Sequence, residues 1–392
     1  MLDNLINKLN NDGFINVDEF ADTFMLSVLA DIPIIYHGEG GYGKSEMLIS
    51  ALSLFNGRFG MLECDPETTS AAIKGGAIAR TINQEGGSLT EAYYNVANSL
   101  LQHDYFMLEE VLDASFNALS FLKAVITGKK IHINGDEIIN NCKILVCATN
   151  INPTSVTSTV RENQRNSCAA FLQRFMIVEH GWKSHNADDY IALYPSVNEL
   201  PVVQFELTDI DKWRNDVKLI EFNIDLWRLL AKLAEDSANS GNTVSPRAFQ
   251  WTVRLIKSAA LLRGSNVVER CDFRVIDYLS YWSVDWDEVD EAIEEIELRQ
   301  VSNEKLDNFS SRLVKVKKMY EELTNFDFNN LELYWHLQTL HLSITKLYDE
   351  FLTTVTYDDD TEVKYNEVKL QFKSLLNEVA IKLDKLLTPI QL

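Results

Sequence analysis

Basic residues are scarce in this sequence. It carries 36 Lys and Arg against 58 Asp and Glu, a formal net charge of −22 over 392 residues. Such a surface repels phosphate backbones, which argues against a general nucleic-acid binder but leaves room for a local basic patch inside an assembly. No apolar run approaches 18 residues, and the N-terminus has no basic segment followed by an apolar one. We therefore expect no membrane span, no secretory signal and a cytoplasmic protein.

Cysteine is also rare, and the last third of the chain nearly lacks glycine and proline. The five cysteines are odd in number and form no C-x-x-C pair, so they suggest neither a disulfide framework nor a zinc site. We expect them to be reduced and mostly buried. His336 and His341 would lie on different faces of a helix, which does not suggest a metal site. After Gly264 there is no further glycine, and Pro389 is the one later proline. This favours helices joined by polar turns.

Short β-type runs alternate with helical patterns in the first half of the chain, as in a parallel sheet covered by helices on both sides. The runs are Ile32–Tyr36, Phe59–Glu63, Tyr105–Glu109, Ile144–Ala148 and Phe175–Val178. We predict an α/β fold with three sections: a core over residues 1–200, a helical section over 201–300, and an acidic, all-helical extension over 301–392.

Apolar residues mark the expected interior of the two helical sections. For residues 201–300 the candidate core residues are Trp213, Trp227, Leu229, Leu230 and Leu233. For the extension the apolar positions that suit packed helices are Leu331, Leu333, Trp335, Leu337, Leu340 and Leu342.

One segment matches the phosphate-loop pattern G-x-x-x-x-G-K-[ST] at every position: Gly38, Glu39, Gly40, Gly41, Tyr42, Gly43, Lys44 and Ser45. A strand-type run precedes it and a helical pattern from Glu46 follows it, which is the context that the motif needs. Glycines let backbone amides and the helix N-terminus face phosphates. We expect residues 38–46 to bind ATP, with Lys44 at the β- and γ-phosphates and Ser45 on Mg²⁺.

Two further strand ends carry polar residues that suit phosphoanhydride hydrolysis. Glu109 and Glu110 close an apolar run, where Glu109 would lie in the outer shell of Mg²⁺ and Glu110 would polarise the attacking water. The alternative is a pair of solvated acids. Asn150 closes the next run and could orient that water, or it could simply end a strand in a turn.

The order of five segments resembles an AAA+ ATPase, and more narrowly the MoxR group with its RavA-like members. The segments are the phosphate loop, Leu108-Glu109-Glu110, Ala148-Thr149-Asn150, Leu172-Gln173-Arg174-Phe175 and Ser245-Pro246-Arg247-Ala248. The resemblance covers residues 20 to about 300. It implies an AAA+ core with a five-stranded parallel sheet over residues 1–200 and a helical lid over residues 201–300.

The resemblance also implies roles for three residues. Asn150 matches sensor 1, Arg174 the arginine finger that reaches a neighbouring subunit, and Arg247 the sensor 2 residue that contacts the γ-phosphate from the lid. A structural salt bridge is the alternative for either arginine, and Arg161 and Arg165 are other candidates for the finger. The chain departs from the family in two places: Glu109 stands where the family has Asp, and Gln173 replaces the Asp before the finger.

What the resemblance implies about function is an ATPase that assembles into a homo-oligomeric ring, in this family commonly a hexamer. It would remodel, activate or mature a protein client as a chaperone, commonly through a separate protein with a von Willebrand A domain. Nucleic acid is not an expected partner. The alternatives are a nucleic-acid-stimulated motor or restriction-type NTPase, and a slow nucleotide-gated scaffold. The segments 79–91 and 129–137 are candidates for partner contact, or else ordinary surface hairpins.

Overall fold

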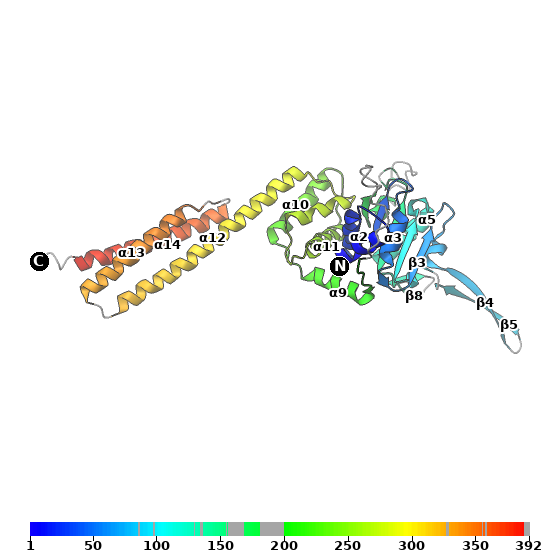
Figure 1. The fold of residues 1–392 in the computed structure, drawn as a ribbon, viewed down its shortest axis with the longest axis horizontal. Coiled ribbons are helices and arrows are strands. Elements are labelled where there is room, and N and C mark those ends of the chain that lie inside the picture. Colours follow the sequence, from blue (N-terminus) through cyan, green and yellow to red (C-terminus); the bar gives the residue numbers. More distant parts are fainter. Residues whose placement is uncertain are drawn as a thin grey trace. The chain divides into compact units, whose positions relative to one another are not determined.

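The computed structural model describes residues 1–84, 87–96, 99–128, 130–133, 136–153, 155, 168–180, 200–326, 329–354, 356 and 359–387. The chain divides into two compact units, residues 1–284 and residues 285–392, which Figure 1 colours from blue to red along the sequence. Among the helices described, none has both the length and the apolar character needed to cross a membrane. All five cysteines are free, and three of them are buried.

A five-stranded parallel sheet forms the centre of the first unit. Its strands lie side by side in the order β10, β1, β9, β6, β3. Their bounds are β1 Ile34–His37, β3 Phe59–Glu63, β6 Tyr105–Glu109, β9 Ile144–Thr149 and β10 Met176–Glu179. Each of the five predicted runs supplies one strand, and the predicted α/β fold with a five-stranded parallel sheet is confirmed. The ends shift by one or two residues: β1 starts after Pro33, which has no amide hydrogen to give to a ladder.

Helices cover both faces of this sheet, since every residue of β1 is buried. On one face Tyr36 stacks on Phe20 of α2 with ring centroids 4.8 Å apart, and its hydroxyl lies 2.8 Å from that of Thr23. On the other face Ile35 belongs to an apolar cluster with residues of α5 and the helical turn at 168–172. The helices of the core are α1 Leu2–Asn11, α2 Asp18–Ala30, α3 Lys44–Leu52, α4 Ser70–Lys74 and α5 Phe116–Thr127.

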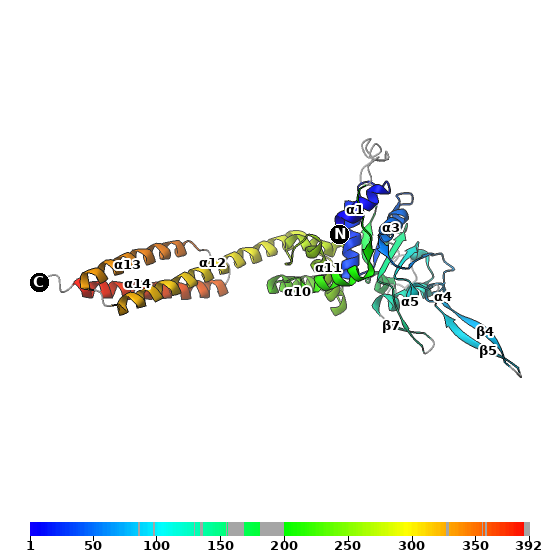
Figure 2. The same cartoon turned by 60° about the horizontal axis from the view of Figure 1, so that its bottom comes forward.

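Two hairpins interrupt the core between its strands. The strands β4 Gly76–Gln84 and β5 Gly87–Asn95 pair antiparallel over their full length, and β7 Lys130–Ile133 pairs with β8 Asp136–Ile139. Both hairpins fall in the segments named as candidates for partner contact. In Figures 1 and 2 the β4–β5 hairpin extends away from the central sheet. Smaller elements complete the core: β2 Phe55–Asn56 with β11 Phe205–Glu206, and the short 3₁₀ turns η1 Leu100–Gln102 and η2 Val111–Asp113.

Further helices follow the sheet in sequence, in the section predicted to form a lid. They are α9 Leu207–Leu219, α10 Ile224–Asn239, α11 Pro246–Leu262 and the 3₁₀ segment η3 Arg270–Tyr278. α11 begins at Pro246, because the Ser245 side chain accepts a hydrogen bond from the Ala248 amide and Pro246 fits the first turn. The expected core placement is wrong for Trp227, whose side chain is 38% exposed and packs edge-on against Phe222 and Phe249.

The second unit is a bundle of three long helices, and the predicted all-helical C-terminal region is confirmed. They are α12 Trp286–Asn325, α13 Asn330–Leu352 and α14 Asp359–Leu387. Residue 301, the predicted start of the extension, lies inside α12, and the division into three sections stays a proposal. Buried residues of all three helices form its core: Leu306, Leu313, Leu340, Ile344, Leu347, Phe351, Val368, Phe372, Leu375 and Val379. Leu331, Trp335 and Leu342 were expected inside this bundle, but all three are more than half exposed.

Candidate active site

The glycine loop connects the end of β1 to the start of α3, at the carboxyl edge of the sheet. Gly38, Gly41 and Gly43 have φ angles of +152°, +88° and +73°, a region that favours glycine. Space is also limiting at Gly38, where a Cβ atom would lie 2.0 Å from the carbonyl oxygen of His180. The loop therefore has the backbone shape of an anion cradle. Glu39, Gly40 and Glu46 lie exposed around it, and Tyr42 is half-buried.

Lys44 is buried at the first position of α3 and folds back over the loop. Its Nζ donates to the Gly38 carbonyl at 2.8 Å, the Glu39 carbonyl at 2.7 Å and the Asn150 Oδ1 atom at 3.0 Å. Burial lowers the pKa of Lys44, while the nearby carboxylates, Glu110 first, act in the opposite direction. Because its three acceptors are uncharged oxygen atoms, the ammonium group can take phosphate oxygens in their place.

Ser45 of α3 and Glu109 of β6 are in contact through their side chains. The Ser45 hydroxyl, in the first turn of α3, donates a hydrogen bond to the Glu109 carboxylate at the end of β6. Hydroxyl and carboxylate oxygens are ligands that suit Mg²⁺. Within the described residues no group of three His, Cys, Asp or Glu side chains could hold a metal alone. The pair fits a magnesium ion that takes its remaining ligands from phosphate and water.

Glu110 adopts a left-handed backbone conformation, with φ 48° and ψ 44°. This conformation is uncommon for a residue with a side chain, and it turns the chain directly after β6. The Glu110 carboxylate accepts two hydrogen bonds from Asn150, one from the backbone amide at 2.9 Å and one from Nδ2 at 2.5 Å. Asn150 therefore contacts Lys44 through one side-chain atom and Glu110 through the other. The structure brings together Lys44, Ser45, Glu109, Glu110 and Asn150.

Arg174 and Arg247 lie apart from this group, in a cavity of about 410 Å³ that we name the arginine pocket. Its lining residues are Ala170, Gln173, Arg174, Ser245, Pro246, Arg247, Ala248 and Trp251. None of the five residues of the loop site is among them. The pocket faces the N-terminus of α11, whose backbone amides favour anions.

The electrostatics of the arginine pocket also favour an anion. Arg174 Nη1 donates to the Ala170 carbonyl, whereas its buried Nε has no hydrogen-bond partner in the described part of the chain. The pKa of Arg174 is lowered, first by burial and second by the charge of Arg247. Two like charges side by side in a partly desolvated pocket gain from a negative ligand. Arg161 and Arg165, the other candidates for the finger, lie outside the described residues.

His180 is a residue of the site that sequence reasoning missed. It directly follows β10, its backbone amide donates to the His37 carbonyl at 2.7 Å, and its Nε2 lies 3.3 Å from the Tyr42 carbonyl. Burial lowers its pKa. The signal was available, because His180 is a polar residue directly after a buried strand, as Glu110 and Asn150 are. It holds the loop from the side opposite Asn150.

Comparisons with known proteins agree with this geometry at the level of the fold. No family model matches the chain. Two uncharacterized proteins of Methanocaldococcus jannaschii are similar in sequence. MJ0812 is 24% identical over 88% of this chain and 90% of the relative, and MJ0079 is 20% identical over 94% and 96%.

Solved structures were compared with the chain by fold. The crystal structure of a "putative ATPase" from Cytophaga hutchinsonii superposes with a TM-score of 0.53 at 14% identity, over 74% of this chain and 91% of that one. A full-length MCM homologue from Methanopyrus kandleri gives a TM-score of 0.42 at 14% identity. The chain shares the α/β fold of the Cytophaga structure, and its glycine loop and paired strand-end acids lie at the carboxyl edge of the sheet.

Proposed function

We propose that this chain is a MoxR-like AAA+ ATPase that hydrolyses ATP in a ring oligomer to remodel, activate or mature a protein client. One observation carries the enzymatic part: Lys44, Ser45, Glu109, Glu110 and Asn150 converge on the glycine loop from three different elements. A structural loop has no need of a buried lysine beside two strand-end glutamates. The motifs of the sequence support the MoxR-like assignment, and the fold supports an ATPase-like protein.

The roles of the residues follow from their positions. Lys44 exchanges its bonds to loop carbonyls for bonds to phosphate oxygens, and the loop amides hold the rest of the triphosphate. Ser45 and Glu109 would hold Mg²⁺, with Glu109 in its outer shell, and the ion would neutralise charge on the phosphates. Glu110 accepts a proton from the attacking water once Asn150 releases its carboxylate. Asn150 then orients the water through its amide.

The arginine pocket supports an assembly of several copies. The resemblance implies that Arg174 acts on a neighbouring subunit and that Arg247 contacts the γ-phosphate from the lid, without naming the subunit that Arg247 serves. The two arginines share one pocket that excludes the loop residues. We therefore propose that both act on the terminal phosphate of a nucleotide held by a second copy of the chain. Such a contact is head-to-tail, and it closes into a ring or continues as a spiral.

A protein is the client class that the charge of the chain favours. With a net charge of −22, a nucleic-acid client would be repelled over most of the surface. The β4–β5 hairpin extends from the core and offers backbone edges to a partner, which suits protein contact. We propose that the chain acts on its client through a separate protein with a von Willebrand A domain.

A second candidate function is a nucleotide-gated scaffold with slow turnover. Both carboxylate oxygens of Glu110 accept a hydrogen bond from Asn150, which makes the carboxylate a weaker proton acceptor in this conformation. If that arrangement persists with nucleotide bound, the chain would bind ATP and assemble without hydrolysing it quickly.

Steady-state phosphate release separates the two candidates. Glu110→Gln should lower the rate at least about 100-fold while ATP still binds, because the proton acceptor is lost and the loop is not. Glu63→Gln is the matched control, since Glu63 ends β3 in register with Glu109 but lies outside the site. Equal rates for Glu110→Gln and the wild type would refute the hydrolytic role of Glu110, and a slow wild-type rate would favour the scaffold.

A further inference from the structure

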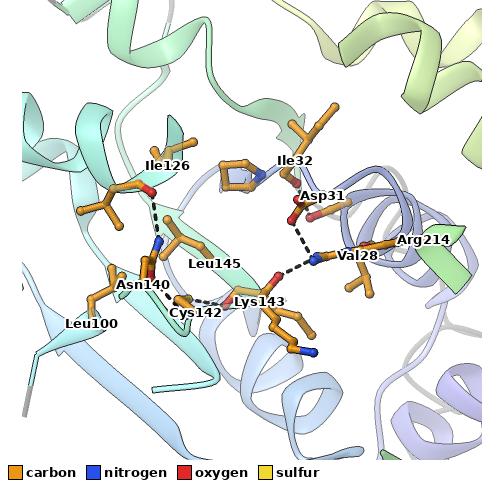
Figure 3. A pocket seen from close by; sticks show the side chains of 14 residues that line it. Val28, Asp31, Ile32, Leu100, Ile126, Asn140, Cys142, Lys143, Leu145 and Arg214 are labelled. Carbon is orange, nitrogen blue, oxygen red and sulfur yellow. Dashed lines mark hydrogen bonds and ion pairs between the residues drawn. The ribbon is translucent and has the colours of Figure 1, made fainter. Parts of the chain in front are cut away.

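A small polar cavity marks the junction of core and lid, at the edge of the sheet opposite the glycine loop. Its volume is about 70 Å³, enough for a few water molecules and too small for a cofactor. Figure 3 shows the junction: Asp31 directly follows α2, β9 begins after Lys143, and Arg214 enters from α9.

Arg214 forms the main link across this junction. Its Nη1 lies 2.9 Å from Asp31 Oδ1, its Nε donates to the Val28 carbonyl at 2.9 Å, and its Nη2 donates to the Lys143 carbonyl at 2.7 Å. The guanidinium group is a rigid planar fork, so three bonds in three directions fix α9 against the core. The side chain of Arg214 is 17% exposed, and water competes little for these bonds.

Asp31 extends the link to a second lid helix. Its Oδ2 lies 4.0 Å from Arg254 Nη1, and Arg254 belongs to α11, two turns after Arg247. The backbone of Asp31 is left-handed, with φ 54° and ψ 45°. Glycine takes this conformation without strain, so the aspartate is kept at an energetic cost. Its carboxylate lies between Arg214 and Arg254 of the lid, and these two ion pairs can offset that cost.

The link decides how the two arginines of the arginine pocket face each other. Arg174 lies on the core side of the pocket, two residues before β10, whereas Arg247 lies on α11 of the lid. A rotation of the lid on the core would therefore move the two guanidinium groups relative to each other. Asp31 and Arg214 oppose such a rotation at the far edge of the sheet, together with the ion pair between Lys143 and Asp211 of α9.

We propose that Asp31 and Arg214 are positioning residues that lock the lid to the core and so hold Arg247 opposite Arg174. This inference rests on the proposed function of the arginine pocket. Both residues act at a distance: neither lines the loop site or the arginine pocket. Loss of the lock should lower the rate of hydrolysis without weakening nucleotide binding at the loop.

The test uses Asp31→Asn, which keeps the shape and the left-handed preference of the residue but removes its charge. We expect the rate at saturating ATP to fall about tenfold, with the affinity of a fluorescent ATP analogue changed less than about twofold. Arg228→Gln is the control, because Arg228 is a lid arginine in an exposed ion pair with Asp225. Asp31→Gly relieves the backbone strain and should show the same loss of rate. Wild-type turnover in Asp31→Gly would overturn the proposal.

Two further measurements separate the lock from simple destabilisation and from failure of the proposed function. In an Arg247→Ala background, Asp31→Asn should have no additional effect on the rate, because it acts through Arg247; additive losses would overturn the proposal. Amide hydrogen exchange needs no hydrolysis. Asp31→Asn should speed exchange in α9 and α11 and leave α14 unchanged. Unchanged exchange in α9 and α11 would refute the lock, whereas absent wild-type hydrolysis would refute the proposed function alone.

Discussion

The sharing of one pocket by Arg174 and Arg247 makes a prediction about which subunit supplies each arginine. If both act on a neighbour's nucleotide, a subunit with a dead loop still supplies two working arginines. A subunit that lacks an arginine still supplies a working loop. Lys44→Ala disables nucleotide binding at the loop of its own subunit. Arg174→Ala or Arg247→Ala disables the supply of cations to the neighbouring subunit.

The size of the effect follows from the environment of the pocket. Arg174 is partly desolvated and has a lowered pKa beside Arg247, so its attraction for an incoming phosphate is weakly screened. Removing a finger from a phosphoryl-transfer site costs on the order of 10³-fold in rate. That corresponds to about 4 kcal/mol of transition-state stabilisation. Each single variant alone should therefore be nearly inactive.

Mixing the variants gives the decisive assay. In a random equal mixture of Lys44→Ala with Arg247→Ala, about one interface in four combines an intact loop with intact arginines. Phosphate release should recover to about that fraction of the wild-type rate, as it should for Lys44→Ala with Arg174→Ala. A mixture of Lys44→Ala with Glu110→Gln is the control, because both lesions lie in the loop site and no interface is repaired. Recovery with Arg174→Ala but none with Arg247→Ala would show that Arg247 serves its own subunit.

Three further predictions concern the loop, pH and the helical bundle. Gly38→Ala should abolish nucleotide binding, because its Cβ would lie 2.0 Å from the His180 carbonyl oxygen. Gly41→Ala has open space around it, so it should bind nucleotide and lower the free energy of urea unfolding by about 1 kcal/mol. Equal loss of nucleotide binding in the two variants would contradict this. Burial lowers the pKa of His180 from 6.5, so the unfolded chain binds the proton first and stability should fall as pH drops below 6.5. His180→Asn should flatten that decline in urea midpoints, and an unchanged slope would exclude His180 as its source. Phe351→Ala should cost residues 285–392 about 3–5 kcal/mol by calorimetry and spare nucleotide binding, because Phe351 is fully buried in the bundle; weaker binding would show that the bundle supports the loop.

The strands and the loop site were predictable because their signals are local. An apolar run of five residues between turn signals reads as a buried strand, and parallel strands bring their carboxyl ends to one edge. Glu110 and Asn150 were expected there for that reason, and they lie in contact. The hydrogen bond between them was not predictable, since it depends on the left-handed turn at Glu110.

Burial within the helical regions was harder to predict. α13 carries apolar residues on two faces: Leu337 and Leu340 point into the bundle, whereas Trp335 is 60% exposed. Both sets recur at helical spacing, so periodicity alone cannot say which one is inside. The choice depends on where the other helices pack, and that is a property of the whole unit.

Arg174 and Arg247 show what a sequence motif can and cannot predict. A motif names the chemistry of a residue, because only a guanidinium offers a charged planar fork. It does not name the subunit that the residue serves, since Arg174 and Arg247 are far apart in sequence and each could face either side of an interface. That choice depends on how the lid sits on the core, and thus on residues such as Asp31 and Arg214 that belong to no motif. A chain with the same five loop residues but a rotated lid would bind ATP equally well. It would not place Arg174 and Arg247 together at the phosphate held by the neighbouring subunit.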